Sequence, residues 1–168
     1  MIRGMKKKRQ LTTVDLEDKE LKMLAQVRRK LRAPSKSETI RMDAGLGLGV
    51  LLRELCEDVS IWTFSDNLVQ VPPRRGFALR DAMKHSQPHS GTHLAGALQT
   101  LHGLHKYDRI IVITDEQTHD GIVAPHGVGY VINVASYKNG IGYGAWTHID
   151  GWSESVIDYV RHAESELR

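Results

Sequence analysis

Cysteine is nearly absent from this sequence, because Cys56 is the only one among 168 residues. A single thiol excludes an internal disulfide and is typical of a reducing cytoplasm. Long apolar runs are also lacking: no stretch approaches the ~20 residues of a membrane span, and the basic start of the chain leads into no apolar signal core. We therefore expect a soluble, cytoplasmic protein without a membrane partner.

Several motifs of enzymes and cofactor-binding proteins are missing too. No G-x-S-x-G segment offers a nucleophile on a sharp turn, so acids such as Asp66 and Asp120 have no nucleophile to activate. The three glycines of GLGLG lie inside an apolar helical pattern and lack the spacing of a dinucleotide-binding loop. The nine histidines match no zinc signature. The sequence therefore predicts a protein that is not an enzyme.

Positive charge is concentrated at one end of the chain. Residues 1–33 hold eleven lysines and arginines against four acidic residues, although the whole chain has a net charge of only +3. Such a segment is either a solvated tail or a contact for nucleic acid, where basic side chains release counterions from phosphates. The candidate RNA contacts are Lys6, Lys7, Lys8, Arg9, Arg28, Arg29 and Lys30. Apolar residues recur at helical spacing over 16–31, so we expect a partly helical basic extension, 1–33, before a domain at 34–168.

Helices and strands alternate through the rest of the chain. Ser35 and Glu38 form a capping box that opens a helix reaching about Cys56. Its expected buried stripe is Ile40, Ala44, Leu48, Leu51, Leu52 and Leu55, and its three glycines would suit a backbone close against a sheet. Phe77, Leu79 and Met83 are the expected apolar contacts of the helix at 77–85. The patterns then predict a strand hairpin at 59–64 and 68–71, helices at 77–85 and 93–105, buried strands at 110–113 and 129–134, a long loop at 135–152 and a last helix from 153. This order is typical of an α/β fold: a doubly wound, mostly parallel, Rossmann-like sheet with helices on both faces.

Two polar loops should meet at the carboxyl edge of that sheet. Ser90-Gly91-Thr92 precedes a helix, and Thr114-Asp115-Glu116 follows the apolar strand. Ligands of open α/β sheets bind outside the carboxyl ends of the strands. A threonine hydroxyl and an aspartate carboxylate are oxygen donors that suit Mg²⁺. The alternative is that Thr114 and Asp115 only cap the following turn.

Six stretches carry a resemblance to a known family: SKSETIRMDAG, WTFSDNLVQVPPRRGFALRDA, SGTHLAGAL, DRIIVITDEQTHDG, YVINVASYKNG and WTHIDGW. They resemble the von Willebrand factor A (vWA) domain, in the version found in TROVE, or Ro-type, ribonucleoproteins. The resemblance implies that Thr92 and Asp115 match the second and third motifs of a metal-ion-dependent adhesion site (MIDAS). In such a site Mg²⁺ is completed by an acidic group of a protein partner. Ser65, His93 and Glu116 are the expected partner-binding residues beside it.

The sequence departs from the family at the first motif, aspartate-x-serine-x-serine. In the family this motif ends the first, central strand just before the helix that begins here at Ser35, where this chain reads LAQVRRKLRAP. Its loss leaves too few oxygens for a cation that prefers about six, so the Mg²⁺ site is expected to be degenerate. Residues 11–15, LTTVD, are the candidate for the central strand, with Asp15 as the substitute metal ligand. The competing idea is that residues 1–33 do not belong to the domain.

Together these observations predict a noncatalytic vWA-like interaction module that binds a protein partner through an acidic group. The family's RNA-binding ring of helical repeats precedes the A domain and has no counterpart in this sequence. The alternative function is therefore RNA binding through the basic N-terminal segment alone.

Overall fold

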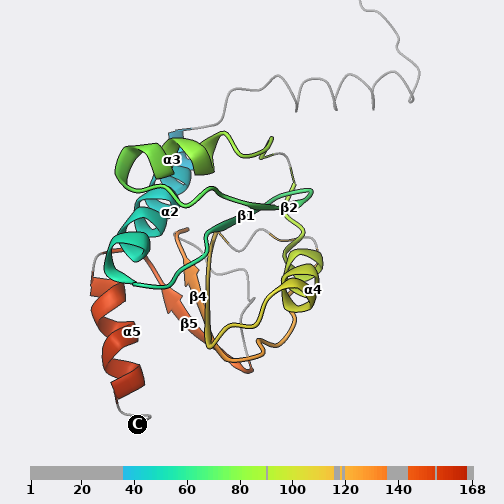
Figure 1. Cartoon of the computed structure of the whole chain (residues 1–168), viewed down its shortest axis with the longest axis vertical. Helices are drawn as coiled ribbons and strands as arrows, with labels where there is room; N and C mark the ends of the chain where they lie inside the picture. The colour runs from blue at the N-terminus through green and yellow to red at the C-terminus, as the bar shows by residue number, and fades with distance from the viewer. Residues whose placement is uncertain are drawn as a thin grey trace, which may run out of the picture. The chain divides into compact units, whose positions relative to one another are not determined.

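A computed structural model of the chain describes residues 36–89, 91–115, 118, 120–135, 144–153 and 155–165 (Figure 1). Its helices are α2 (Lys36–Leu55), α3 (Gly76–Lys84), α4 (Leu94–Leu104) and α5 (Ser155–Ser165). Its strands are β1 (Trp62–Phe64), β2 (Leu68–Gln70), β3 (Arg109–Thr114), β4 (Val128–Asn133) and β5 (Trp146–Asp150). The helix predicted at 16–31 and the strand predicted at 11–15 lie outside the described residues.

The described strands form two sheets. β3, β4 and β5 make a parallel three-stranded sheet in that order, and β1 and β2 make an antiparallel hairpin. The prediction of an α/β fold with a parallel sheet is thus confirmed. The prediction of a loop throughout 135–152 is wrong, because β5 pairs with β4 from Gly129↔Trp146 to Asn133↔Asp150.

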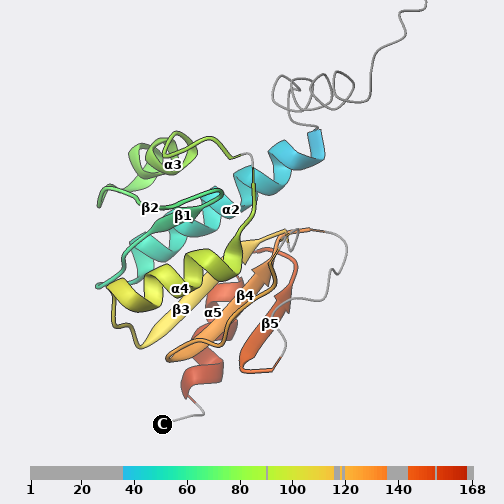
Figure 2. The ribbon, with the colours of Figure 1, turned by 90° about the vertical axis from the view of Figure 1, so that its right-hand side faces the viewer.

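Helices cover both faces of the parallel sheet (Figure 2). On one face, Leu94 and Leu98 of α4 pack in a cluster with Val112 of β3 and Val131 of β4. On the other face, Ala44 and Leu48 of α2 and Val156 of α5 form a second cluster. They pack there with Ile132 of β4 and with Val134, which follows that strand. Successive side chains of a strand point to opposite faces, so an apolar run such as Ile110 to Ile113 supplies both layers.

One glycine of α2, Gly49, permits close packing of this helix. A Cβ on Gly45 would lie 3.5 Å from Cγ2 of Ile113 in β3, and a Cβ on Gly49 would lie 3.0 Å from Sδ of Met83 in α3. Gly45 thus faces the sheet at an ordinary contact distance, whereas the close approach at Gly49 is to the neighbouring helix α3. A Cβ on Gly47 would meet nothing within 4 Å.

Some residues expected in the core lie at the surface instead. Phe77 is 83% exposed, and Ile40 and Leu55, expected on the buried stripe of α2, are exposed as well. Leu46 is buried in their place, in a third cluster with Val71 and Leu79. This cluster joins α2 to α3 and the hairpin, so α2 is covered on two sides and its buried surface is wider than one stripe.

Both sheets end on strands with one paired side. The carbonyls of Asp108 and Thr114 point to β4, where they accept hydrogen bonds from the amides of Val128 and Val134, each at 2.9 Å. Backbone direction alternates along a strand, so the amides of Ile111 and Ile113 point away from β4. Among the described residues, no strand pairs with that side of β3, nor with the side of β1 that faces away from β2.

Candidate functional site

Asp115 follows β3 at the carboxyl edge and forms an ion pair with a helix residue. Its Oδ2 lies 3.2 Å from Nη1 of Arg41, and the two side chains are 27% and 16% exposed. Arg41 also donates from Nε to the carbonyl of Ser37, one helical turn earlier, at 3.2 Å. The guanidinium is thus oriented by its own helix, and it holds the loop after β3 against α2.

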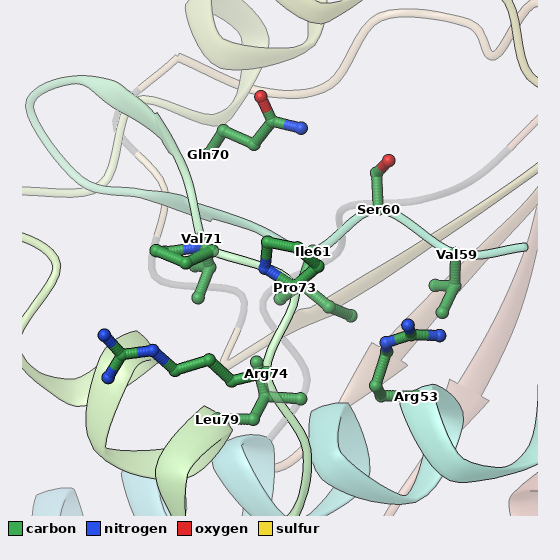
Figure 3. Close-up of a pocket in the computed structure, with 10 residues that line it drawn as sticks. Arg53, Val59, Ser60, Ile61, Gln70, Val71, Pro73, Arg74 and Leu79 are labelled. Atoms are coloured by element: carbon green, nitrogen blue, oxygen red, sulfur yellow. The ribbon is translucent and has the colours of Figure 1, made fainter.

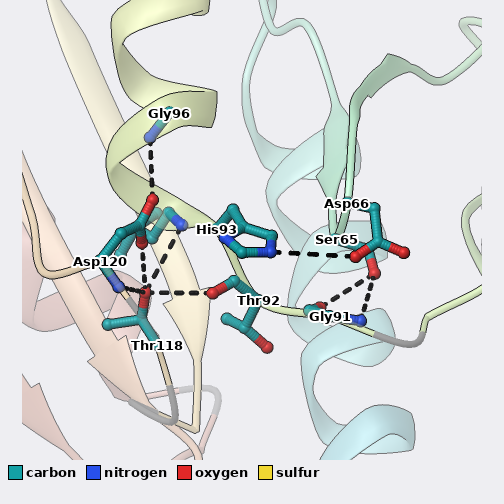
Figure 4. A network of polar contacts seen from close by, with 9 residues as sticks. Ser65, Asp66, Gly91, Thr92, His93, Gly96, Thr118 and Asp120 are labelled. Carbon is teal, nitrogen blue, oxygen red and sulfur yellow. Dashed lines mark hydrogen bonds and ion pairs between the residues drawn. The ribbon is translucent and has the colours of Figure 1, made fainter. Parts of the chain in front are cut away.

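The end of β1 is fastened to the loop before α4 (Figure 4). The Ser65 hydroxyl donates to the Gly91 carbonyl at 2.9 Å and accepts from the Gly91 amide at 3.0 Å. The Ser65 carbonyl accepts from the amide of His93 at 3.2 Å. Ser65 is 2% exposed, so its hydroxyl organises this loop, while His93 is exposed, with Nε2 4.0 Å from Oδ1 of Asp66.

The loop after β3 reaches the loop before α4 through Thr118 (Figure 4). Thr118 Oγ1 lies 2.7 Å from Oδ1 of Asp120 and 3.3 Å from the carbonyl oxygen of Thr92. A hydroxyl has one proton to donate, and the shorter distance assigns it to the Asp120 carboxylate. The Leu94 amide at the start of α4 donates to Thr118 Oγ1 at 3.5 Å, so Thr118 connects the two segments. Asp115 instead pairs with Arg41 of α2.

Asp120 caps α4 from a distant loop. The residue before that helix, His93, makes no side-chain capping bond, and the Gly96 amide donates to Oδ2 of Asp120 at 3.1 Å. Burial acts to raise the pKa of the Asp120 carboxyl, but hydrogen bonds from Thr118 and from the first amides of α4 outweigh it and lower the pKa. The carboxylate thus stabilises the positive end of the α4 dipole.

A row of polar side chains continues along the same edge. The register places Thr114, Asn133 and Asp150 side by side as the last residues of β3, β4 and β5. Asn133 is buried; its Nδ2 donates to Oδ1 of Asp150 at 3.3 Å, and its Oδ1 accepts from the Ala135 amide at 2.9 Å. His148 Nδ1 lies 3.7 Å from the same Asp150 oxygen. These contacts hold the ends of β4 and β5 together, and the Asp150 carboxylate is partly exposed to solvent.

A Mg²⁺ ion at Asp115 would compete with Arg41 for the carboxylate. A guanidinium already lies against one carboxylate oxygen. Repulsion between the guanidinium and a monovalent cation 4 Å from it would be about 4 kcal/mol at an effective dielectric constant of about 20. For a divalent cation the repulsion would be about twice as large.

A second titratable cluster lies at the amino end of β3. The rings of His102 and His126 are 3.9 Å apart, and the Tyr107 hydroxyl lies 2.6 Å from Nε2 of His102. The same hydroxyl accepts from the His126 amide at 3.1 Å. Burial lowers the pKa of His102, and the charge of His126 lowers it further.

No family model, no curated protein and no solved structure matches this chain. Helices long and apolar enough to cross a bilayer are not found in the described part of the chain.

Several residues singled out from the sequence cannot be placed. Glu116, Asp15 and the basic residues from Lys6 to Lys30 lie outside the described residues. Conversely, sequence reasoning missed Arg41 and Thr118. Arg41 lies one turn after Ser37 on the face of α2 that the carboxyl edge approaches, and only knowledge of that approach would have revealed it.

Proposed function

We propose that this chain is a noncatalytic, vWA-like interaction module that binds its protein partner without a metal ion. One observation carries the proposal: the Arg41 guanidinium lies 3.2 Å from Asp115, the carboxylate that the resemblance assigns to the metal. Arg41 supplies, from within the chain, the positive charge that a cation supplies in a MIDAS site.

The arrangement of the elements supports the vWA-like part of this proposal. Helices lie on both faces of a parallel sheet, and the loops that carry Ser65, Thr92 and Asp115 lie at strand ends or a helix start. A complete doubly wound sheet would join the β1–β2 hairpin to β3 through one further strand. The edge would then present Arg41 and His93 toward a partner that carries an acidic group.

Metal titration tests the proposal directly. The full chain, labelled with ¹⁵N, is titrated with Mg²⁺ while amide shifts near Asp115 are followed. We expect no saturable shift tighter than millimolar. The Arg41→Met variant removes the built-in charge and should bind Mg²⁺ at least as well as the parent. Arg80→Met, which removes a surface pair with Asp43, is the matched control.

Submillimolar Mg²⁺ affinity in the parent that is lost in Thr92→Ala would overturn the proposal, because the site would then be a working metal site.

RNA binding through residues 1–33 is the second candidate, favoured by eleven basic residues in that segment. It requires RNA affinity that falls with salt concentration and disappears when the segment is removed.

A further inference from the structure

The floor of the pocket between α2, the hairpin and the start of α3 belongs to the core of the protein. Leu79 and Val71, which line it, are only 0% and 3% exposed (Figure 3). The surface of α4 carries a different kind of feature, because one loop is attached to both ends of this helix. We call residues 120–127 the strap, and its two attachments differ in their response to acid.

The strap is attached to the amino end of α4 through Asp120 (Figure 4). Oδ2 of Asp120 accepts a hydrogen bond from the Gly96 amide at 3.1 Å, and Oδ1 accepts one from the Thr118 hydroxyl at 2.7 Å. Burial acts to raise the pKa of this carboxyl, but the hydrogen bonds from Thr118 and from α4 lower the pKa overall. Asp120 therefore keeps its charge, and its contact with α4, in mild acid.

The middle of the strap packs on the apolar cluster between α4 and the sheet. Ile122 and Val123 lie against this cluster, and the Val123 carbonyl accepts a hydrogen bond from Nε1 of Trp146 at 2.9 Å. A Cβ on Gly129 of β4 would lie 2.7 Å from Cγ of Pro125, so a side chain at position 129 would push the strap away from the sheet. The strap thus covers part of the cluster that contains Trp146.

The strap is attached to the carboxyl end of α4 through His126. The centroids of the His126 and His102 rings lie 3.9 Å apart, and the His126 amide donates to the Tyr107 hydroxyl at 3.1 Å. The same hydroxyl lies 2.6 Å from Nε2 of His102. Because the hydroxyl accepts from His126, its own proton is available to Nε2. The arrangement therefore favours a neutral His102 with Nε2 as the acceptor.

The surroundings of the two rings disfavour a second positive charge. Burial lowers the pKa of His102, and the charge of His126 lowers it further. Among the described residues, no acid forms an ion pair with either ring. The neighbouring titratable groups are His105 of α4, Lys106, Tyr107 and Asp108 of the loop before β3, and Asp120 of the strap. Arg109 of β3 is paired with Glu164 of α5, and Trp62 of β1, which contacts the His105 ring, is uncharged.

We propose that acid releases the carboxyl end of the strap from α4, while Asp120 holds the amino end as a hinge. At neutral pH the stacked imidazoles and the Tyr107 hydroxyl keep the strap closed. When both rings carry a proton, two positive charges 3.9 Å apart repel each other. The strap then opens, Trp146 loses the Val123 carbonyl, and the apolar cluster under the strap becomes accessible. This device is independent of the ion pair at Asp115 and goes beyond the proposed function.

Hydrogen exchange in the full ¹⁵N-labelled chain at pH 7.5 and pH 5.0 tests the proposal. Protection is the intrinsic exchange rate divided by the measured rate, which removes the direct effect of pH on exchange. We expect the protection of the Trp146 indole N–H and of the His126 amide to fall at least tenfold at pH 5.0. The Gly96 amide, which donates to Asp120, should keep its protection within twofold.

Two variants separate the histidine pair from other titrating groups. His126→Gln removes the charge of the exposed ring and keeps the backbone amide, so the loss of protection at Trp146 should shrink to less than twofold. His102→Gln, which keeps a polar group near Tyr107, should have the same effect. His105→Gln, at the exposed end of the same helix, is the matched control and should retain the full loss.

Unchanged protection of Trp146 in the parent at pH 5.0 would overturn the inference. A full loss in both His126→Gln and His102→Gln would also overturn it. Equal losses at Gly96 and Trp146 would do the same, because the whole domain would then be unfolding. His126 is exposed, so its replacement keeps the test valid even where His102→Gln does not fold.

Discussion

The Arg41 guanidinium lies 3.2 Å from Oδ2 of Asp115 and joins the second turn of α2, the longest described helix, to the end of β3. Both side chains are less than one-third exposed, so each charge depends on the other more than an open surface pair would. This ion pair therefore contributes to stability and also sets the charge of the candidate site.

Loss of either partner of this pair should destabilise the fold. Arg41→Met or Asp115→Asn should lower the free energy of unfolding by about 1–3 kcal/mol, because each removes an ion pair from a partly buried position. The double variant should cost less than the sum of the two single variants. Urea unfolding measures all three. Arg80→Met, at an exposed pair with Asp43, should change stability by about 1 kcal/mol or less.

Removal of the Asp120 cap should weaken α4. Asp120→Asn should cost about 1 kcal/mol, since the amides of the first turn lose a charged acceptor. The folded-state pKa of Asp120 lies below its usual value of 3.8. The stabilisation is therefore complete above pH 3.8 and is lost as the pH falls through the folded-state pKa.

Thermal unfolding followed from pH 7 to pH 2 checks this prediction. The difference between the parent and Asp120→Asn should shrink in acid, whereas Asp58→Asn, at an exposed acid, should track the parent throughout. A constant difference across that range would contradict the capping role.

The histidine cluster should make stability fall in mild acid. The folded-state pKa of His102 lies below its usual value of 6.5, because burial and the nearby His126 disfavour the charged ring. Protonation is therefore easier in the unfolded chain, and stability declines as the pH drops below 6.5 until the folded-state pKa is reached. Urea unfolding at pH 7.5 and pH 5.5 measures the decline, which should be smaller in His102→Gln. His85→Gln, in the exposed C-cap of α3, is the control.

Amide hydrogen exchange should distinguish the two sides of β3. The amides of Ile110 and Val112 face β4 and should exchange slowly, while those of Ile111 and Ile113 face away and should exchange at least 10-fold faster. Equal protection on both sides would mean that a segment outside the described residues pairs with β3. Residues 11–15 would then be the first segment to examine, by repeating the measurement on a chain that lacks them.

Local pattern was enough to predict most of the elements. The apolar run at Ile110 to Ile113 is typical of a strand covered on both faces, and β3 has apolar clusters on both faces. The helices α2 and α4 begin within one residue of where the sequence placed them. β5 was missed because WTHID contains polar residues and follows a glycine-rich stretch. It is a strand because β4 offers it a partner, which a single segment cannot reveal.

The site was less predictable because it depends on contacts between distant segments. Ser65 and Gly91 are separated by 26 positions, and Arg41 and Asp115 by 74. Asp115 was correctly placed after a strand, yet nothing in its neighbourhood indicated an arginine partner from α2. Phe77 shows the reverse error: its apolar character favoured burial, but the first turn of α3 directs it to the surface.

The one-sided pairing of β3 has a consequence for the life of the protein after synthesis. Among the residues that the structure describes, no strand pairs with the free side of this most hydrophobic strand, and such edges act as templates with which extended segments of other molecules can pair. A segment of the chain, or another molecule, that pairs with this edge would prevent association with further copies. If this edge stays unpaired during folding, Arg109–Thr114 is the segment from which aggregation should begin.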